Sequence, residues 1–188
     1  MLINKDTIIK DTDPKIREKS LDVPLPLSEE DESLLRELLQ YVIDSTDEEK
    51  AEELNLQPAV GISAIQVGIP KKLTAVVVND YDKNGDPITY QYMLANPRIV
   101  SSSVQKAYLE AGEGCLSVKD VHEGYVVRNA RIKVKAFDLC TNQEIEIRAR
   151  DYLAIVLQHE IDHFSGILYY DHIDKNNPFS HPSDATKI

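Results

Sequence analysis

Cysteine is scarce in this chain, which has only Cys115 and Cys140 among its 188 residues. Two cysteines do not make a disulfide framework, so we expect both thiols to be reduced. Cys140 fits a partly exposed position without a chemical role. A single cysteine is often just a small buried apolar residue, but its thiolate is also a strong ligand for zinc or iron(II). The scarcity therefore directs the question of function to Cys115.

Long apolar runs are also missing. The uncharged apolar stretches are short, such as Leu73–Val78, whereas a membrane-spanning helix needs about 20 apolar residues. The first residues read MLINKDTIIKDTDP and contain neither the apolar segment nor the small-residue cleavage site of a signal peptide. These absences predict a cytoplasmic protein that is not attached to a membrane.

Basic residues are outnumbered by acidic ones. The chain has 21 Lys and Arg against 32 Asp and Glu, which gives a formal net charge of −11. Nucleic-acid binding depends on cations that neutralise phosphates, and anionic membrane surfaces attract basic patches. The charge therefore argues against direct nucleic-acid binding and membrane association, and it favours a small-molecule or peptide ligand.

The length fits one domain spanning residues 1–188, and the sequence contains no internal repeat. A first helix is expected at Ser28–Ser45, because Ser28 can cap it, acidic residues fill its first turn and leucines recur at helical spacing. The acidic stretch Thr46–Gln57 that follows is expected to be a short helix or a surface loop.

Downstream of this stretch the hydrophobic period changes towards two, which is typical of strands. Strands are expected at Leu73–Val78, Thr89–Leu94, Val126–Asp138 and Glu144–Arg148, with an Asn84-Gly85 hairpin turn. A second helix is expected at Asp151–Phe164, capped by Asp151 and ended by Gly166. The pattern predicts an α+β fold in which mostly antiparallel β-sheets pack around this central helix.

The second helix contains the run His159-Glu160-Ile161-Asp162-His163. Residues four apart lie on one face of a helix, so His159 and His163 can bind the same metal ion. Glu160 then lies beside the ion and can serve as general base for a water molecule. The pattern is short enough to arise by chance. However, apolar neighbours would bury this helix, and buried histidines and glutamates are costly unless they are paired or coordinated.

A catalytic metal typically has three protein ligands and one open position, so a third ligand is needed. Some metalloproteases use the extended pattern H-E-x-x-H-x-x-G-x-x-H, but this chain has Tyr169 in place of the last histidine. Other metalloproteases use a downstream glutamate as the third ligand, but no glutamate follows Glu160. The weaker candidates just past the helix are Asp171, His172 and Asp174. Cys115 is the stronger candidate, because it stands in the run Gly112-Glu113-Gly114-Cys115-Leu116-Ser117, where glycines permit close backbone approach.

Three motifs together resemble the peptide deformylase family, and their order and spacing agree with it. They are Ala59-Val60-Gly61-Ile62-Ser63-Ala64-Ile65-Gln66, Glu113-Gly114-Cys115-Leu116-Ser117 and the His159–His163 run. The resemblance extends from about Asp13 to Asp174. The chain departs from the usual pattern at Ala59, where glycine is common, at Ser63, where alanine is common, and at Ile65. Its acidic insertion and polar C-terminal tail resemble the form found in Gram-positive bacteria and mycoplasmas.

The resemblance implies a metal-dependent hydrolase that removes the formyl group from the formyl-methionine of nascent polypeptides and releases formate. It implies one divalent metal ion held by Cys115, His159 and His163, natively iron(II) and replaceable by zinc, nickel or cobalt. The implied partners are N-formyl-methionyl peptides, with transient association with the ribosome and its nascent chain.

The resemblance also implies a role for each remaining site residue. Glu160 would transfer protons, while the Gln66 side chain and the Leu116 backbone N–H would stabilise the oxyanion. Gly61 and Val60 would contact the substrate backbone. Glu113 is expected to orient the site through hydrogen bonds rather than to take part in the chemistry.

Two other readings remain open from the sequence. One is a metallopeptidase, against which the missing downstream third ligand counts. The other is a non-enzymatic metal-binding protein, although a structural zinc site is typically closed by four protein ligands and the chain offers three convincing ones.

Overall fold

The computed structural model describes residues 3–82 and 84–188. Its helices are α1 (Glu29–Ser45), α2 (Glu48–Glu53) and α3 (Asp151–His163), with short 3-10 turns η1 (Pro14–Arg17), η2 (Ala64–Val67) and η3 (Tyr169–His172). Its strands are β1 (Gly61–Ser63), β2 (Leu73–Tyr81), β3 (Pro87–Ser102), β4 (Lys106–Tyr108), β5 (Arg128–Asn129), β6 (Arg131–Asp138), β7 (Gln143–Arg150) and β8 (Thr186–Lys187). Among the described helices, none is long and apolar enough to cross a membrane.

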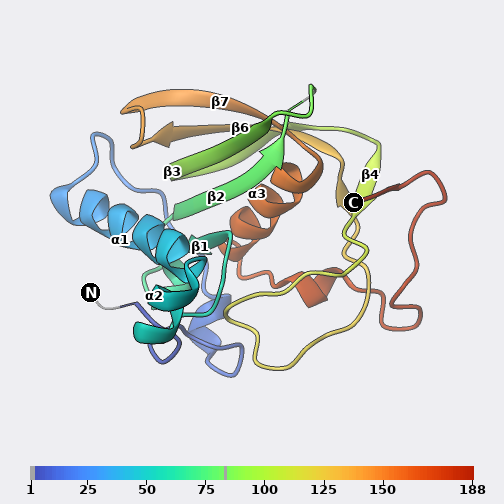
Figure 1. Cartoon of the computed structure of the whole chain (residues 1–188), viewed down its shortest axis with the longest axis horizontal. Coiled ribbons are helices and arrows are strands. Elements are labelled where there is room, and N and C mark those ends of the chain that lie inside the picture. Colours follow the sequence, from blue (N-terminus) through green and yellow to red (C-terminus); the bar gives the residue numbers. More distant parts are fainter. Residues whose placement is uncertain (1–2, 83) are drawn as a thin grey trace.

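The strands form two sheets. Five strands make an antiparallel sheet in the order β1-β2-β3-β6-β7, and three short strands make a second sheet in the order β5-β4-β8. In the small sheet, β4 pairs antiparallel with β5 but parallel with β8. Figure 1 shows the large sheet above, with α3 and the longer loops beneath it. The predicted α+β class with mostly antiparallel sheets is confirmed.

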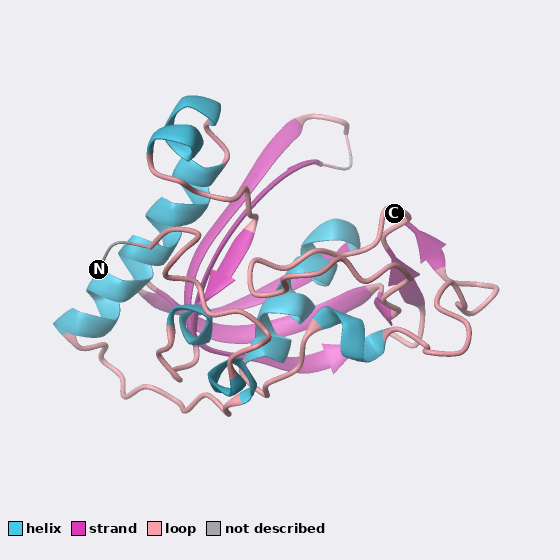
Figure 2. Cartoon of the chain, turned by 90° about the horizontal axis from the view of Figure 1, so that it is seen from below, coloured by secondary structure: helices cyan, strands magenta, loops and turns pink. Residues whose placement is uncertain are grey.

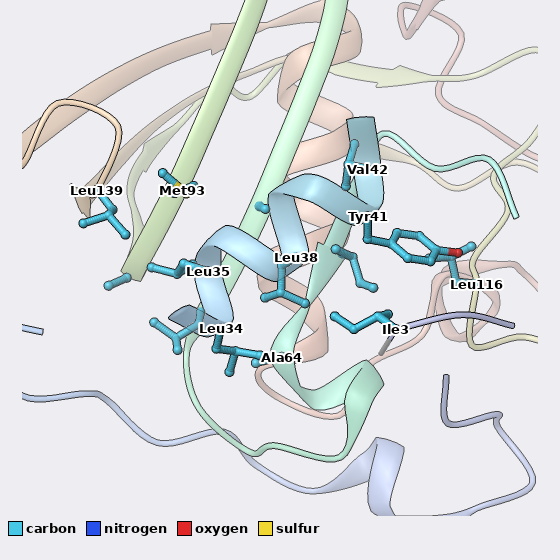
Figure 3. Packing of buried hydrophobic residues seen from close by; sticks show 14 of the residues in the cluster. Ile3, Leu34, Leu35, Leu38, Tyr41, Val42, Ala64, Met93, Leu116 and Leu139 are labelled. Carbon is cyan, nitrogen blue, oxygen red and sulfur yellow. The ribbon is translucent and has the colours of Figure 1, made fainter. Parts of the chain in front are cut away.

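The first helix forms where the sequence predicts it. The Ser28 hydroxyl accepts a hydrogen bond from the Asp31 backbone N–H at 3.2 Å, which caps the helix. Its apolar face is buried, and Leu35 and Leu38 are fully excluded from solvent. Figure 3 shows these side chains packed between the large sheet and the chain around Ala64 and Leu116. Burial of this face, rather than helix propensity alone, fixes α1 against β2.

Strand β2 separates two cores, because successive residues of a strand point to opposite faces of its sheet. Leu73 and Ala75 belong to the apolar cluster that contains the buried face of α1. Val76 and Val78 belong to a second cluster, which contains the apolar residues of α3. The two helices therefore pack on opposite faces of β2, and α3 is held by apolar contacts with the strands around it.

Both ends of α3 differ from the prediction. The N-cap residue is Arg150, which makes no side-chain capping bond, and Asp151 is the first helical residue rather than the cap. The Asp151 carboxylate instead accepts a hydrogen bond from Arg150 Nε at 2.7 Å. At the other end the helix stops at His163, and Gly166 adopts a left-handed φ of 68° in the turn that follows. A side chain at Gly166 would collide with the backbone of Arg17.

The other expected elements are present with longer or divided limits. The strand predicted at Leu73–Val78 extends to Tyr81, and its partner begins at Pro87 and runs to Ser102. The stretch Val126–Asp138 is divided into β5 and β6. Asn84 and Gly85 lie in the turn between β2 and β3, while Lys83 lies outside the described residues.

Candidate active site and metal centre

The three expected metal ligands converge, although they come from two distant segments. Cys115 lies in the loop between β4 and β5, whereas His159 and His163 lie one turn apart on α3. One ligand atom from each of the three residues lies within 4.8 Å of the other two. The Cys115 Sγ atom is 3.5 Å from His163 Nε2. Helical spacing thus places the imidazoles side by side, and the loop brings the sulfur to them.

The donor set fits a divalent transition-metal ion. One thiolate and two imidazoles are ligands that zinc and iron(II) accept, and metal binding needs neutral imidazole. Burial lowers the pKa of His163 well below its usual value, which favours the neutral ring that a metal requires. Burial also acts to lower the pKa of His159, but the contacts with Cys115 and Glu113 raise it well above its usual value, so metal binding would displace a proton from this ring. Three protein donors, rather than four, correspond to a catalytic site with an open position.

The weaker candidates for a third ligand have other partners. His172 Nε2 lies 2.7 Å from the Asp162 carboxylate. Asp171 forms an ion pair with Arg17. Asp174 accepts hydrogen bonds from the backbone N–H groups of Asn176 and Asn177. These three side chains are therefore engaged in contacts other than with the sulfur of Cys115.

Glu160 is buried beside the ligand cluster and held in a fixed position. The Ser63 hydroxyl donates a hydrogen bond to Glu160 Oε2 at 2.7 Å, and the Thr74 hydroxyl lies 3.5 Å from the same oxygen. Burial raises the pKa of the Glu160 carboxyl above its usual value. The Ser63 and Thr74 contacts were not predicted, because β1 and β2, which contain these residues, are far from α3 in the sequence.

Gly61 makes room for this carboxylate. A Cβ atom added at Gly61 would lie 2.7 Å from Glu160 Oε1, which is closer than real side chains approach. The residue was predicted to contact the substrate backbone. The structure adds a second requirement, because any larger residue at this position would displace Glu160.

A buried ion network supports His159. The Glu113 carboxylate lies 2.8 Å from His159 Nδ1, so the other ring nitrogen is free to face the ligand cluster. Arg128 bonds both oxygens of Glu113, at 2.5 and 2.9 Å, and also reaches Asp162 at 2.9 Å. Burial alone would raise the pKa of Glu113, but hydrogen bonds from Arg128 and His159 bring it to about 2. Arg128 was not predicted, because an isolated arginine before a strand has no motif.

Gln66 is fully buried and points at the same cluster. Its Nε2 lies 3.6 Å from Cys115 Sγ and 3.2 Å from Ser117 Oγ, and its Oε1 accepts a hydrogen bond from the Ser63 N–H at 2.9 Å. These contacts hold the side-chain amide beside the sulfur. Leu116, the other residue expected to supply an oxyanion donor, follows Cys115 directly and lines a cavity beside the ligand cluster.

A cavity of about 370 Å³ opens beside these groups. Val60, Gly61, Gln66, Cys115, His159 and Glu160 all line it. Its apolar walls come from several segments, namely Leu109, Tyr152, Ile155 and Val156. The walls could not be predicted, since these residues come from a loop and from the face of α3 beside the ligands. The combination of an apolar cavity, a buried carboxylate and three metal donors fits hydrolysis of a small linear amide.

Comparisons with known families agree with this geometry. The model of the family described as polypeptide deformylase matches residues 5–179. The chain is 46% identical over 188 residues to peptide deformylase 2 of Bacillus cereus, covering 100% of this chain and 99% of the relative. It is 45% identical to the peptide deformylase of Staphylococcus epidermidis, with complete coverage of both chains.

Solved structures give the same result. The crystal structure of peptide deformylase from Ehrlichia chaffeensis in complex with actinonin matches with a TM-score of 0.69 and 29% identity, covering 94% of this chain and 91% of that one. A probable peptide deformylase from Synechococcus phage S-SSM7 matches with a TM-score of 0.67 and 29% identity, covering 88% of this chain and 98% of that one. The chain therefore belongs to the polypeptide deformylase family, the metal-dependent enzymes that remove the N-formyl group from nascent peptides.

Proposed function

We propose that Cys115, His159 and His163 hold a single divalent ion at which this chain deformylates N-formyl-methionyl peptides. The observation that carries the proposal is the convergence of three ligand atoms within 4.8 Å of one another beside Glu160 and the cavity. A bound divalent ion would polarise the formyl carbonyl and lower the pKa of a water molecule to about 7. The side chains around the site would carry out proton transfer and stabilise the developing negative charge.

Glu160 is the proton carrier of the proposed reaction. It accepts a proton from the attacking water and delivers it to the amine nitrogen as the bond to the formyl carbon breaks. Its burial raises the pKa of the carboxyl, which moves the group towards the value that suits both steps. The hydrogen bond from Ser63 keeps one carboxylate oxygen occupied, so the other oxygen, which lies nearest Gly61, is the one that handles the proton.

Negative charge that develops on the formyl oxygen needs fixed donors. The Gln66 amide is suited to this task, because the backbone N–H of Ser63 holds its oxygen and leaves Nε2 directed towards Cys115. The backbone N–H of Leu116 is the second proposed donor. The Gln66 amide is held by its hydrogen bonds before substrate arrives, so it would need little reorganisation during the reaction.

The substrate backbone is proposed to lie along β1. This strand stands at one end of the order β1-β2-β3-β6-β7, so one of its edges has no partner strand among the described residues of the large sheet. Val60 and Gly61 present this edge to the cavity, where a peptide can pair with it. The methionine side chain would then enter the apolar part of the cavity, which Leu109, Tyr152 and Ile155 bound.

Iron(II) is the proposed native ion, and zinc, nickel or cobalt are proposed replacements. A mixed thiolate and imidazole site accepts each of these metals, and a thiolate beside iron(II) is sensitive to oxygen. Metal analysis of protein purified without oxygen, followed by activity measurements during aeration, tests this identity. Stable activity of the iron form through prolonged aeration would contradict it.

The wider setting is also a proposal. We infer one catalytic domain over residues 1–188, with α3 as its central element, working in the cytoplasm where formylated chains leave the ribosome. The interactions with the ribosome and its nascent chain are transient, without membrane attachment and without direct binding of nucleic acid by this acidic chain.

The central experiment compares formyl-Met-Ala with acetyl-Met-Ala as substrates of the metal-loaded protein. A deformylase releases amine from the formyl compound alone, whereas a peptidase would cut an internal peptide bond. In the Glu160→Gln variant we expect activity to fall by about 10²–10⁴-fold, the usual contribution of a positioned general base, with metal content unchanged. Full activity of this variant with metal bound would contradict the role of Glu160.

A further inference from the structure

The C-terminal segment, residues 184–188, pairs with strand β4, which is followed directly by the cavity-lining residue Leu109. It lies beyond the residues that the family model matches, which end at 179. Strand β8 pairs in parallel with β4, placing Thr186 opposite Ala107 and Lys187 opposite Tyr108. Figure 1 shows the C-terminus beside β4. The sequence had predicted only a polar tail here, because a two-residue strand has no recognisable pattern.

Ile188 forms two backbone hydrogen bonds, one to the residue before Leu109 and one to the residue after it. The Ile188 N–H donates to the Tyr108 carbonyl at 3.0 Å, and the Glu110 N–H donates to the Ile188 carbonyl at 2.9 Å. Leu109 lies between these two bonded residues and forms part of the cavity wall. The tail therefore fixes the backbone on both sides of a residue that faces the proposed substrate.

The side chain of Ile188 supports the same wall. It is half-buried and packs against a small apolar cluster of Ala107, Ala130 and Ile155, against which Leu109 also packs. Leu109 and Ile155 line the cavity, whereas Ile188 does not. Ile188 therefore acts on the cavity through its neighbours, and loss of its side chain would leave the cluster underpacked.

Polar and aromatic contacts fasten the rest of the tail. Gln105 Nε2 donates to the Asp184 carbonyl at 2.6 Å, and the Lys187 ammonium pairs with Glu110 at 2.8 Å. The His181 ring stacks on Tyr108 with centroids 4.6 Å apart. All three contacts reach the segment 105–110, so the tail is bound along the whole length of β4 and its continuation.

We propose that residues 184–188 are a positioning element that fixes Leu109 and Ile155 and so sets how tightly the cavity holds the side chain of the first substrate residue. The inference rests on the proposed function, because it takes the cavity as the site of that side chain. A wall fixed in advance favours binding, since less ordering is needed when the side chain enters. The element acts on selection of the side chain rather than on the chemical step.

The test uses the metal-loaded full chain, a variant lacking residues 184–188, and the variant Ile188→Ala. Steady-state kinetics are measured with formyl-Met-Ala-Ser and formyl-Ala-Ala-Ser. We expect the KM for the methionine substrate to rise roughly tenfold, the lower end of the value of a methylene-sized contact in an apolar pocket. The kcat should change by less than about twofold, because loss of a contact made equally in the ground state and the transition state raises KM alone. The KM for the alanine substrate, which does not fill the cavity, should stay the same.

Lys187→Ala is the matched control, because its ion pair with Glu110 is exposed and its side chain does not pack on the apolar cluster. It should keep the selectivity of the original chain. Hydrogen exchange gives a readout without activity: the Glu110 amide should exchange faster in the truncated chain, while the amides of α3 keep their rates. If truncation prevents folding, Ile188→Ala decides.

Unchanged selectivity in a folded truncated chain and in Ile188→Ala would overturn the inference, as would an equal fall in kcat for both substrates. Failure of the unaltered chain to deformylate either substrate would instead contradict the proposed function. The two failures are therefore distinguishable in one experiment.

Discussion

The proposed metal ligands come from two regions in which apolar packing and polar contacts contribute to different degrees. Helix α3 supplies two imidazoles and is fixed by apolar burial, with Ala154 and Leu157 fully excluded from solvent. The loop of residues 109–127 supplies the sulfur and contains no helix or strand. Figure 2 shows long loop segments of this kind across the underside of the molecule.

Specific polar contacts tie the loop to its surroundings. Lys10 Nζ donates to the Leu116 carbonyl at 2.5 Å, and the Asp11 N–H donates to the Ser117 carbonyl at 2.7 Å. Glu113 adds its bonds to Arg128 and His159. Apolar packing tolerates small losses in many places, whereas a contact made by a side chain, such as that of Lys10 or Glu113, can be removed by one substitution. We therefore expect substitutions that disturb the packing of α3 to lower the free energy of unfolding. Substitutions that remove contacts of the loop should mainly displace the proposed metal ligand.

The largest effect is expected from Arg128→Ala, which breaks the contact between the two regions. The substitution would leave Glu113 and Asp162 without their shared buried cation, which lowers the free energy of unfolding by about 3–5 kcal/mol. Metal affinity should also fall by about 10–100-fold, because His159 loses its oriented partner. Urea denaturation and metal titration measure the two effects.

Arg148→Ala is the control for this prediction. The Arg148 side chain is 77% exposed and lies 3.5 Å from Glu146, so its loss should change stability by less than about 1 kcal/mol. Equal effects of the two substitutions would show that the buried network does not join the loop to the helix.

The second-largest effect is expected from a substitution that alters only the packing of α3. Leu157→Ala removes a fully buried side chain from the cluster between α3 and the sheet, and should lower the free energy of unfolding by about 3 kcal/mol. Below the unfolding transition the variant should still bind one metal ion with near-normal affinity, because no contact of the loop is altered. Loss of metal from the folded variant would mean that helix packing also sets the geometry of the ligands.

The same contrast explains what the sequence could predict. Helical spacing predicts α1 and α3, and with α3 the adjacent placement of His159 and His163. Those features follow from local periodicity, as does the hairpin at Asn84 and Gly85. The position of the loop depends instead on Lys10, which is distant in the chain, and on Arg128, which directly follows the loop. Neither residue belongs to a recognisable motif. Cys115 could be proposed as the third ligand from its glycine-rich context and thiolate chemistry, and family resemblance supported that choice. The walls of the cavity could not be predicted.

The third prediction concerns the position of the Glu160 carboxylate on α3. Gly61→Ala would bring a methyl group to 2.7 Å from Glu160 Oε1 and force the carboxylate to move. Because displacement of a catalytic group by about 1 Å can reduce the rate by about 10²-fold, we expect kcat/KM to fall by roughly tenfold to a hundredfold. Steady-state kinetics with formyl-Met-Ala measure the change.

Gly114→Ala gives the corresponding change in the loop. A Cβ atom at Gly114 would meet nothing within 4 Å, and the residue is exposed. Its kcat/KM should fall less than that of Gly61→Ala, because the added methyl group displaces no protein atom even though Gly114 lines the cavity. A larger loss from Gly114→Ala than from Gly61→Ala would reverse the assignment of the crowded and open positions.

The smallest effect is expected from Lys10→Ala, which removes one polar contact of the loop. The substitution deletes the hydrogen bond to the Leu116 carbonyl and should lower the free energy of unfolding by about 1 kcal/mol, the usual value of one such bond. Because the contact belongs to the loop alone, amides at residues 116–118 should exchange with solvent faster while those of α3 keep their rates. The exposed Lys19→Ala should change neither set of amides. If Lys10→Ala instead accelerated exchange in α3, the loop and the helix would form one cooperative unit, and their separate modes of attachment would have no consequence for the metal site.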